Sequence, residues 1–272
     1  MRFGVAEFIR KYPALSLFLV AVAFGSALVA PVLAGWLSPQ FLQLGALSAS
    51  AAGFVVAAAE GGKASVRESL TRGRIWRVGV RWWLAAVFLP LVPALAAISL
   101  AAAYTNQPVD WSALGPWYSV IPVMLVLITF AGLGEEFGWR GFALPRLRLR
   151  HNALVATLII GGFHALWHIP LFLVKGEAYN TLASQIGFLP AFLGYACLVL
   201  ALSFQLTWIF ANAGGSVLLA AVYHGAGNAW AGYVAIDRAG LAGQVAFTAV
   251  HVMVAVLLVV LFGPRTLSRA HP

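Results

Sequence analysis

Long apolar segments dominate this sequence and limit the folds that it can adopt. Eight can be recognised, near residues 13–34, 41–59, 79–103, 116–144, 153–174, 186–210, 214–236 and 241–263. Most have the roughly 20 residues that a helix needs to cross the hydrocarbon core of a bilayer. A helix satisfies its own backbone hydrogen bonds without water, and the segments lack the alternation of membrane strands. The sequence therefore predicts an all-α polytopic membrane protein, with about eight transmembrane helices in one bundle.

The composition excludes an ordinary soluble protein. Charged residues make up 9% of the chain, against roughly 25% in soluble domains, and apolar residues make up 62%. So few polar side chains cannot cover a surface that faces water. No polar stretch is long enough to fold alone, since the largest covers about residues 60–78. We therefore expect a single transmembrane domain over residues 1–272.

The positive charges predict how the chain crosses the membrane. Fifteen of the 17 Lys and Arg residues fall in the N-terminal tail, the connection after the second segment, the end of the fourth segment and the C-terminal tail. They are Arg2, Arg10, Lys11, Lys63, Arg67, Arg72, Arg74, Arg77, Arg81, Arg140, Arg146, Arg148, Arg150, Arg265 and Arg269. The alternate connections contain only Lys175 and Arg238, together with Asp110, Glu177 and Asp237.

Cytoplasmic connections are rich in Lys and Arg, so this asymmetry places both termini in the cytoplasm. The protein is then an integral protein of the cell (plasma) membrane. Its formal net charge of +9 matches anionic lipid headgroups. Nucleic acid is not an expected partner, because no basic region interleaved with aromatic residues is present.

Ionisable residues inside membrane spans are costly and often functional. The fourth segment contains Glu135 and Glu136, followed by Arg140. Glu136 and Arg140 are one helical turn apart, which predicts a neutralising ion pair. Glu135 points about 100° away and has no partner on its own helix. A buried carboxylate of this kind suits a general base.

Two later segments each contain a pair of polar residues at the same spacing of four. The fifth has His164 and His168, and the seventh has His224 and Asn228. Counted along the helices, Glu135 and these polar groups lie about 15 to 22 Å from one membrane face, so they can meet at one level. His251 in the eighth segment has no nearby polar partner and is expected to pack in the bundle or at its interface.

The three motifs resemble the CAAX protease and bacteriocin-processing (CPBP or Abi) family of intramembrane endopeptidases. Its pattern is E-E-x-x-x-R, then F-x-x-x-H, then H-x-x-x-N, and the resemblance covers about residues 118–236. The first motif is Glu135-Glu136 with Arg140, the second ends at His168, and the third is His224 with Asn228. The chain departs from the pattern at His164, which stands where the family has Phe, and a role for this residue is left open.

The resemblance implies a glutamate-type intramembrane endopeptidase whose catalytic core is residues 118–236. Glu135 would activate water and His168 would help to hold it. His224 and Asn228 would stabilise the oxyanion, with Glu136, Arg140 and His164 in support. The expected substrate is a peptide or membrane protein, with membrane lipid around it, and no metal or other cofactor is expected. Family members include proteases that trim prenylated CAAX ends and bacterial proteins linked to bacteriocin processing or immunity.

Two alternatives remain open from the sequence. The first is a zinc protease, because Glu135, His168 and His224 are a plausible ligand set. The absence of an H-E-x-x-H motif speaks against it. The second is a non-catalytic membrane protein, such as a bacteriocin-immunity protein, a scaffold or a transporter. Loss or retention of function on changing Glu135 separates this class from an enzyme.

Overall fold

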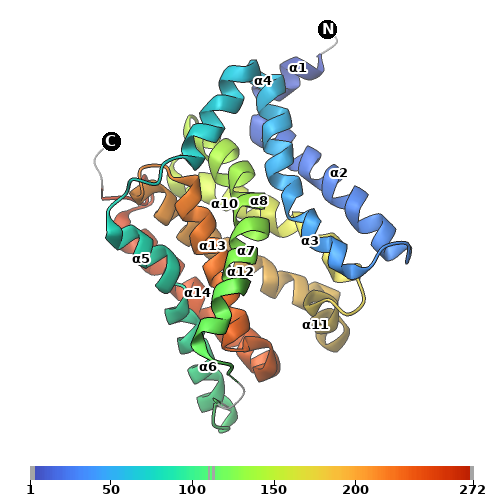
Figure 1. Ribbon diagram of the computed structural model, residues 1–272, viewed down its shortest axis with the longest axis vertical. Helices are drawn as coiled ribbons and strands as arrows, with labels where there is room; N and C mark the ends of the chain where they lie inside the picture. Colours follow the sequence, from blue (N-terminus) through green and yellow to red (C-terminus); the bar gives the residue numbers. More distant parts are fainter. Residues whose placement is uncertain (1–3, 110, 112–113, 270–272) are drawn as a thin grey trace.

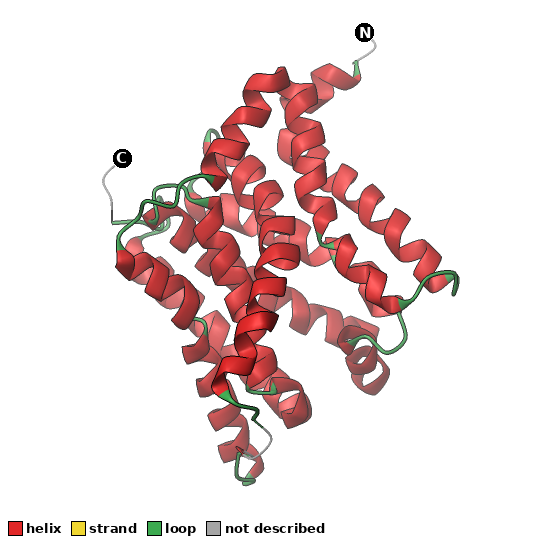
Figure 2. Ribbon diagram, in the orientation of Figure 1, coloured by secondary structure: helices red, strands yellow, loops and turns green. Residues whose placement is uncertain are grey.

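A computed structural model describes residues 4–109, 111 and 114–269 of the chain. Arg2 and Asp110, which contributed to the predicted charge asymmetry, lie outside these residues. The described part is built from helices and contains no strand (Figure 2). The predicted all-helical membrane bundle is therefore confirmed.

The elements follow the predicted segments closely. In the N-terminal third they are α1 (Val5–Lys11), α2 (Pro13–Leu33), η1 (Pro39–Phe41), α3 (Leu42–Gly45), α4 (Leu47–Gly73), α5 (Val80–Phe88) and α6 (Leu91–Thr105). The fourth span is one continuous helical stretch made of η3 (Trp117–Ser119), α7 (Val120–Leu127), η4 (Ile128–Leu133), α8 (Gly134–Glu136), η5 (Phe137–Ala143) and α9 (Leu144–Arg148). The remainder comprises α10 (Ala153–Trp167), η6 (Ile169–Leu173), α11 (Ala178–Ile186), α12 (Phe188–Asn212), α13 (Val217–Tyr233), η7 (Ile236–Ala239) and α14 (Gly240–Phe262).

Seven helical stretches in the described part are long and apolar enough to cross a membrane. The remaining predicted span, the seventh at 214–236, corresponds to α13, which has 17 residues and is about 25 Å long. Ten residues of α13 are buried, and the helix packs against α5, α7, η4 and α12 (Figure 1). Because other helices surround α13, the thickness of the lipid does not set its length.

The second span is longer than the sequence predicted. Residues 60–73 were expected in a polar connection, but they continue α4 as helix. The helix bends at Gly61 and Gly62, and Gly62 has a φ of 64°, which is a left-handed conformation that favours glycine. Its basic residues therefore project from a helix rather than from a loop.

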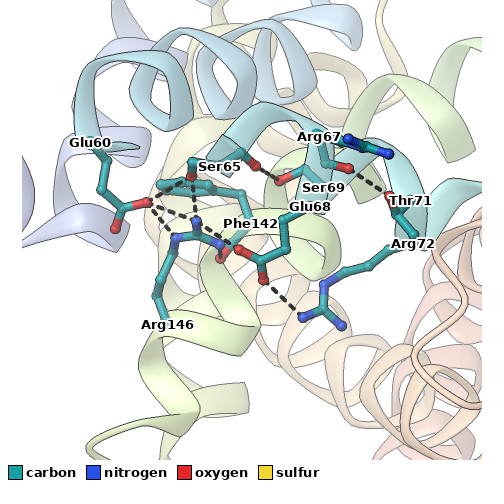
Figure 3. Close-up of polar contacts among 9 residues, drawn as sticks. All are labelled: Glu60, Ser65, Arg67, Glu68, Ser69, Thr71, Arg72, Phe142 and Arg146. Atoms are coloured by element: carbon teal, nitrogen blue, oxygen red, sulfur yellow. Dashed lines mark hydrogen bonds and ion pairs between the residues drawn. The ribbon is translucent and has the colours of Figure 1, made fainter. Parts of the chain in front are cut away.

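A polar network fixes this second half of α4 to the end of the fourth span (Figure 3). Arg146 of α9 donates through Nε and Nη2 to Glu60 Oε2, over 2.9 and 2.8 Å. Its Nη2 also donates to Ser65 Oγ over 2.7 Å, and its guanidinium lies 4.0 Å from the centre of the Phe142 ring. Arg146 is thus a structural cation that joins two spans.

The basic segments come together at one end of the bundle. Arg150 donates to the carbonyl of Lys11 over 3.0 Å, and Arg148 donates to that of Arg265 over 2.7 Å. The first described helix, α1, lies at the top of Figure 1, whereas α11 lies lower in the view. Arg140 differs from the other basic residues of this group, because it is fully buried and does not contribute to the surface charge.

The fourth span passes through the middle of the fold in close backbone contact with its neighbours. A Cβ atom at Gly138 would lie 2.2 Å from the carbonyl oxygen of Ala49 in α4. One at Gly132 would lie 2.3 Å from the carbonyl oxygen of Ala221 in α13. The helix is also π-helical on both sides of the two glutamates, over η4 and η5. Such segments are frequent at functional sites.

Candidate active site

A buried ion pair lies at the base of the site. Arg140 Nη1 is 3.1 Å from both carboxylate oxygens of Glu136, and neither side chain is exposed. Arg140 also donates to the carbonyl of Ser203 over 3.4 Å. The expected pairing of Glu136 with Arg140 is therefore present. Glu136 has a second partner that the sequence did not predict, since His224 Nδ1 lies 2.9 Å from its Oε1.

Glu135 turns away from this pair towards α10, as its place on the helix predicts. It is 4% exposed. Its Oε2 lies 2.7 Å from His164 Nε2, although neither atom is in hydrogen-bond geometry. His164, at which this chain departs from the family motif, is thus the partner that Glu135 lacks on its own helix. The aromatic face of His164 packs against Trp139, with 5.3 Å between ring centres.

His168 caps the C-terminus of α10 and faces the same carboxylate. Its Nδ1 lies 2.9 Å from the carbonyl oxygen of His164, which can only accept, so Nδ1 carries the proton. Nε2 of the neutral ring is then an acceptor. One ligand atom each of Glu135, His164 and His168 lies within 4.8 Å of the others. Two atoms about 4.6 Å apart can share one water at ordinary hydrogen-bond lengths.

A cavity of about 870 Å³ brings the predicted residues together. Glu135 of α8, His168 at the end of α10, and His224 and Asn228 of α13 all line it. His164 lines it as well, whereas Glu136 and Arg140 lie behind the wall. Most of the other lining residues are apolar and come from α11, α12 and α14. Polar groups from three separate spans thus converge on one hollow in an apolar bundle.

The charges at this site can balance in two ways. Glu136 and Arg140 neutralise each other. Glu135 and His224 then have no net charge between them. Either Glu135 is a carboxylate and His224 an imidazolium, or a proton has moved and they are a carboxylic acid and a neutral imidazole. His224 Nδ1 donates to Glu136, so only the imidazolium can also donate from Nε2. An ionised base and a positively charged donor can therefore coexist in the apolar interior without net charge.

Two tyrosines near His168 were not predicted. The centre of the Tyr195 ring lies 5.1 Å from that of His168, and the centre of the Tyr179 ring lies 6.1 Å away. Desolvation raises the pKa of Tyr179 in α11, so its phenol is neutral. A tyrosine within an apolar segment is usually interpreted as a packing residue or as an aromatic residue at the membrane interface. No spacing in the sequence indicated that α11 and α12 would bring them to the cavity.

The histidines and Glu135 also have the residue types of a metal site. The zinc alternative proposed Glu135, His168 and His224 as ligands. In the structure the candidate cluster is Glu135, His164 and His168, and His224 Nδ1 instead donates to Glu136. Two ligands of a tetrahedral zinc ion, each about 2.05 Å from the metal, are about 3.3 Å apart. Glu135 Oε2 and His164 Nε2 are closer than that, at 2.7 Å. These two atoms as placed are therefore closer together than two ligands of one zinc ion, although Glu135, His164 and His168 together have the residue types of a metal site.

Comparison with known proteins agrees with the motifs. The model of the type II CAAX prenyl endopeptidase Rce1-like family matches residues 116–230. CAAX prenyl protease 2 of Methanococcus maripaludis is 30% identical over 104 residues, which cover 38% of this chain and 37% of the relative. The chain thus matches little more than a third of that relative's length. The resemblance seen in the three motifs is confirmed, since this segment of the chain is similar to the CAAX protease family.

Proposed function

We propose that the protein is an intramembrane endopeptidase in which Glu135 activates water for hydrolysis of a peptide bond. One observation supports this most strongly. Glu135, His168, His224 and Asn228 come from three spans and line a single cavity within the segment that matches the family. The cavity provides a base, an acceptor that can orient water, and two donors in an apolar setting. These are the groups that hydrolysis of an amide requires.

The proposed reaction starts with a water held between Glu135 and His168 Nε2. The Glu135 carboxylate takes one proton as the water oxygen attacks the carbonyl carbon of the substrate. The resulting oxyanion accepts hydrogen bonds from His224 Nε2–H and from the Asn228 amide. Collapse of the intermediate breaks the C–N bond, and Glu135 returns its proton to the leaving amine. The products are a carboxylic acid and an amine, and the site returns to its starting state.

The supporting residues keep this arrangement in place. Arg140 neutralises Glu136, and Glu136 in turn orients the His224 ring through its Nδ1. His164 positions the Glu135 carboxylate from one side, and its backbone carbonyl accepts a hydrogen bond from His168 Nδ1. No step in this scheme uses a metal.

The substrate class follows from the setting and from the relative. A cavity between membrane helices suits a peptide, or the end of a membrane protein, that enters from the lipid. The name of the Methanococcus relative points to prenylated CAAX sequences as the first substrates to examine. The charge asymmetry supports a plasma-membrane protein with cytoplasmic termini, so the C-terminal ends of cytoplasmic proteins could reach it.

The decisive test is cleavage of quenched fluorescent peptides by the purified protein, with and without a prenyl group. The Glu135→Gln variant keeps shape and hydrogen bonding but removes the base, and we expect the rate to fall by about 10²–10⁴. Glu68→Gln, at an exposed position of α4, is the matched control and should have the parent rate. Full activity of Glu135→Gln would exclude this mechanism, and a chelator that abolished cleavage would favour a metalloprotease.

A further inference from the structure

The helix α14 has a polar face that the proposed reaction does not use. It belongs to the most apolar of the seven candidate spans, and its polar side chains are Gln244, Thr248 and His251. Their spacing of four and three residues places them on one face of the helix. All three line the cavity that contains Glu135. This helix lies outside residues 116–230, the part that matches the family.

Hydrogen bonding separates His251 from the other two. Gln244 donates to Asp237, and the Thr248 hydroxyl donates to the carbonyl of Gln244 over 2.9 Å, so both are satisfied. His251 is 2% exposed, and its Nε2 is buried without a hydrogen-bond partner among the described residues. Leaving such a group unpaired is costly, which suggests that a ligand completes it.

A chain of hydrogen bonds determines which nitrogen of His251 is protonated. The Tyr223 hydroxyl donates to Gln205 Oε1 over 2.8 Å, and Gln205 Nε2 lies 2.8 Å from His251 Nδ1. Gln205 Nε2 also lies 3.5 Å from the carbonyl oxygen of Ala201, and the reversed amide would place two oxygens together there. Gln205 therefore donates to Nδ1, and the neutral ring carries its proton on Nε2.

We propose that His251 is a substrate-binding residue, whose Nε2–H donates to a backbone carbonyl of the peptide bound along α14. This inference rests on the proposed endopeptidase function. A neutral donor on a largely apolar wall suits a neutral acceptor, and a peptide in a membrane cavity must satisfy its carbonyl groups. Gln205 and Tyr223 act through His251 and are positioning residues. This role goes beyond the expectation from the sequence, that His251 packs in the bundle or at its interface.

The kinetic test compares His251→Phe with the parent protein on a fluorescent peptide. Loss of one hydrogen bond to the bound substrate should raise KM by about 2- to 13-fold and leave kcat unchanged. Ser99→Ala is the control, because it removes a hydroxyl bonded within α6, away from the cavity, and should change neither constant. His251→Gln keeps a donor amide and should have an intermediate KM. Parent values of KM in both His251 variants would overturn the proposal.

A spectroscopic test measures binding without cleavage. In the Glu135→Gln protein with labelled histidine, the ¹⁵N resonance of His251 Nε2 should shift when peptide binds. A peptide with one ester in place of an amide, which weakens one carbonyl acceptor, should abolish the shift at a single position. Two results together would refute the proposal and show a purely structural role for His251. They are a lower stability of the His251 variants and no ¹⁵N shift when peptide binds to the Glu135→Gln protein.

The two proposals fail in different ways. Absence of cleavage by the parent protein, together with a ¹⁵N shift on peptide binding, would refute the endopeptidase mechanism and retain His251 as a peptide contact. Cleavage that depends on Glu135, with an unchanged KM and no shift, would refute only the role of His251.

Discussion

The Arg140→Ala substitution tests the electrostatics on which the site depends. At the observed 3.1 Å, a unit charge pair is worth about 5 kcal/mol at an effective dielectric constant of 20, and about 1 kcal/mol in water. Both side chains are fully buried, so the higher figure applies, less the cost of desolvating Arg140. Removing Arg140 leaves the Glu136 carboxylate buried with only His224 beside it. We expect a loss of about 3–5 kcal/mol in the free energy of unfolding.

The chain offers a matched control for this change. Arg72 and Glu68 in α4 have the same spacing of four residues and an N–O distance of 3.0 Å, but their side chains are 27% and 47% exposed. Arg72→Ala should cost only about 0.3–0.5 kcal/mol. Both variants can be unfolded in mixed micelles of a mild detergent and SDS, and tryptophan fluorescence follows the transition.

The double variant Glu136→Gln with Arg140→Ala isolates the cost of the unpaired charge. It should recover part of the stability lost in Arg140→Ala, because the remaining amide needs no counter-charge. Activity should stay low in both, since His224 loses the carboxylate that orients it. Equal stability losses for Arg140→Ala and Arg72→Ala would refute the argument that burial sets the energy of this pair.

Three further predictions concern packing, catalysis and topology. Gly138→Ala should lower stability by about 1–3 kcal/mol, because its Cβ would meet Ala49 at 2.2 Å, whereas Gly162→Ala, with open space beside it, should be neutral in the same unfolding assay. Asn228→Ala should reduce kcat by about 10²–10³ in the peptide assay as one oxyanion donor is lost; a parent rate would remove it from that role. Reporter fusions in the α6–α7 and α13–α14 connections should read as external, and a cytoplasmic signal at either would contradict the predicted sidedness.

The sequence was sufficient to predict the class of fold. The length of an apolar segment is tied to the thickness of a bilayer, so the spans could be located within a few residues for most of the chain. Two departures depended on tertiary packing. The second half of α4, past Gly62, is in contact with Arg146, and the short helix α13 packs among other helices.

Much of the site could also be predicted from local patterns. A spacing of four residues places two side chains on one helical face, and that rule was enough for the pair of Glu136 with Arg140. The three motifs, taken together, also indicated the family to which residues 116–230 are similar. The catalytic roles of Glu135, His168 and Asn228 stay predictions until cleavage is measured.

The remaining contacts join residues far apart in the chain, and only the tertiary structure decides them. His164 meets Glu135 across 29 positions, and His224 meets Glu136 across 88. His251, isolated in its own segment, finds Gln205 across 46. Periodicity determines which way a side chain points from its own helix, but the partner depends on how helices rotate and stack. In this protein that packing is governed by close backbone approaches at glycines and by buried polar pairs. The sequence alone determined the spans and motifs, whereas the packing of the bundle decided which polar group faces which.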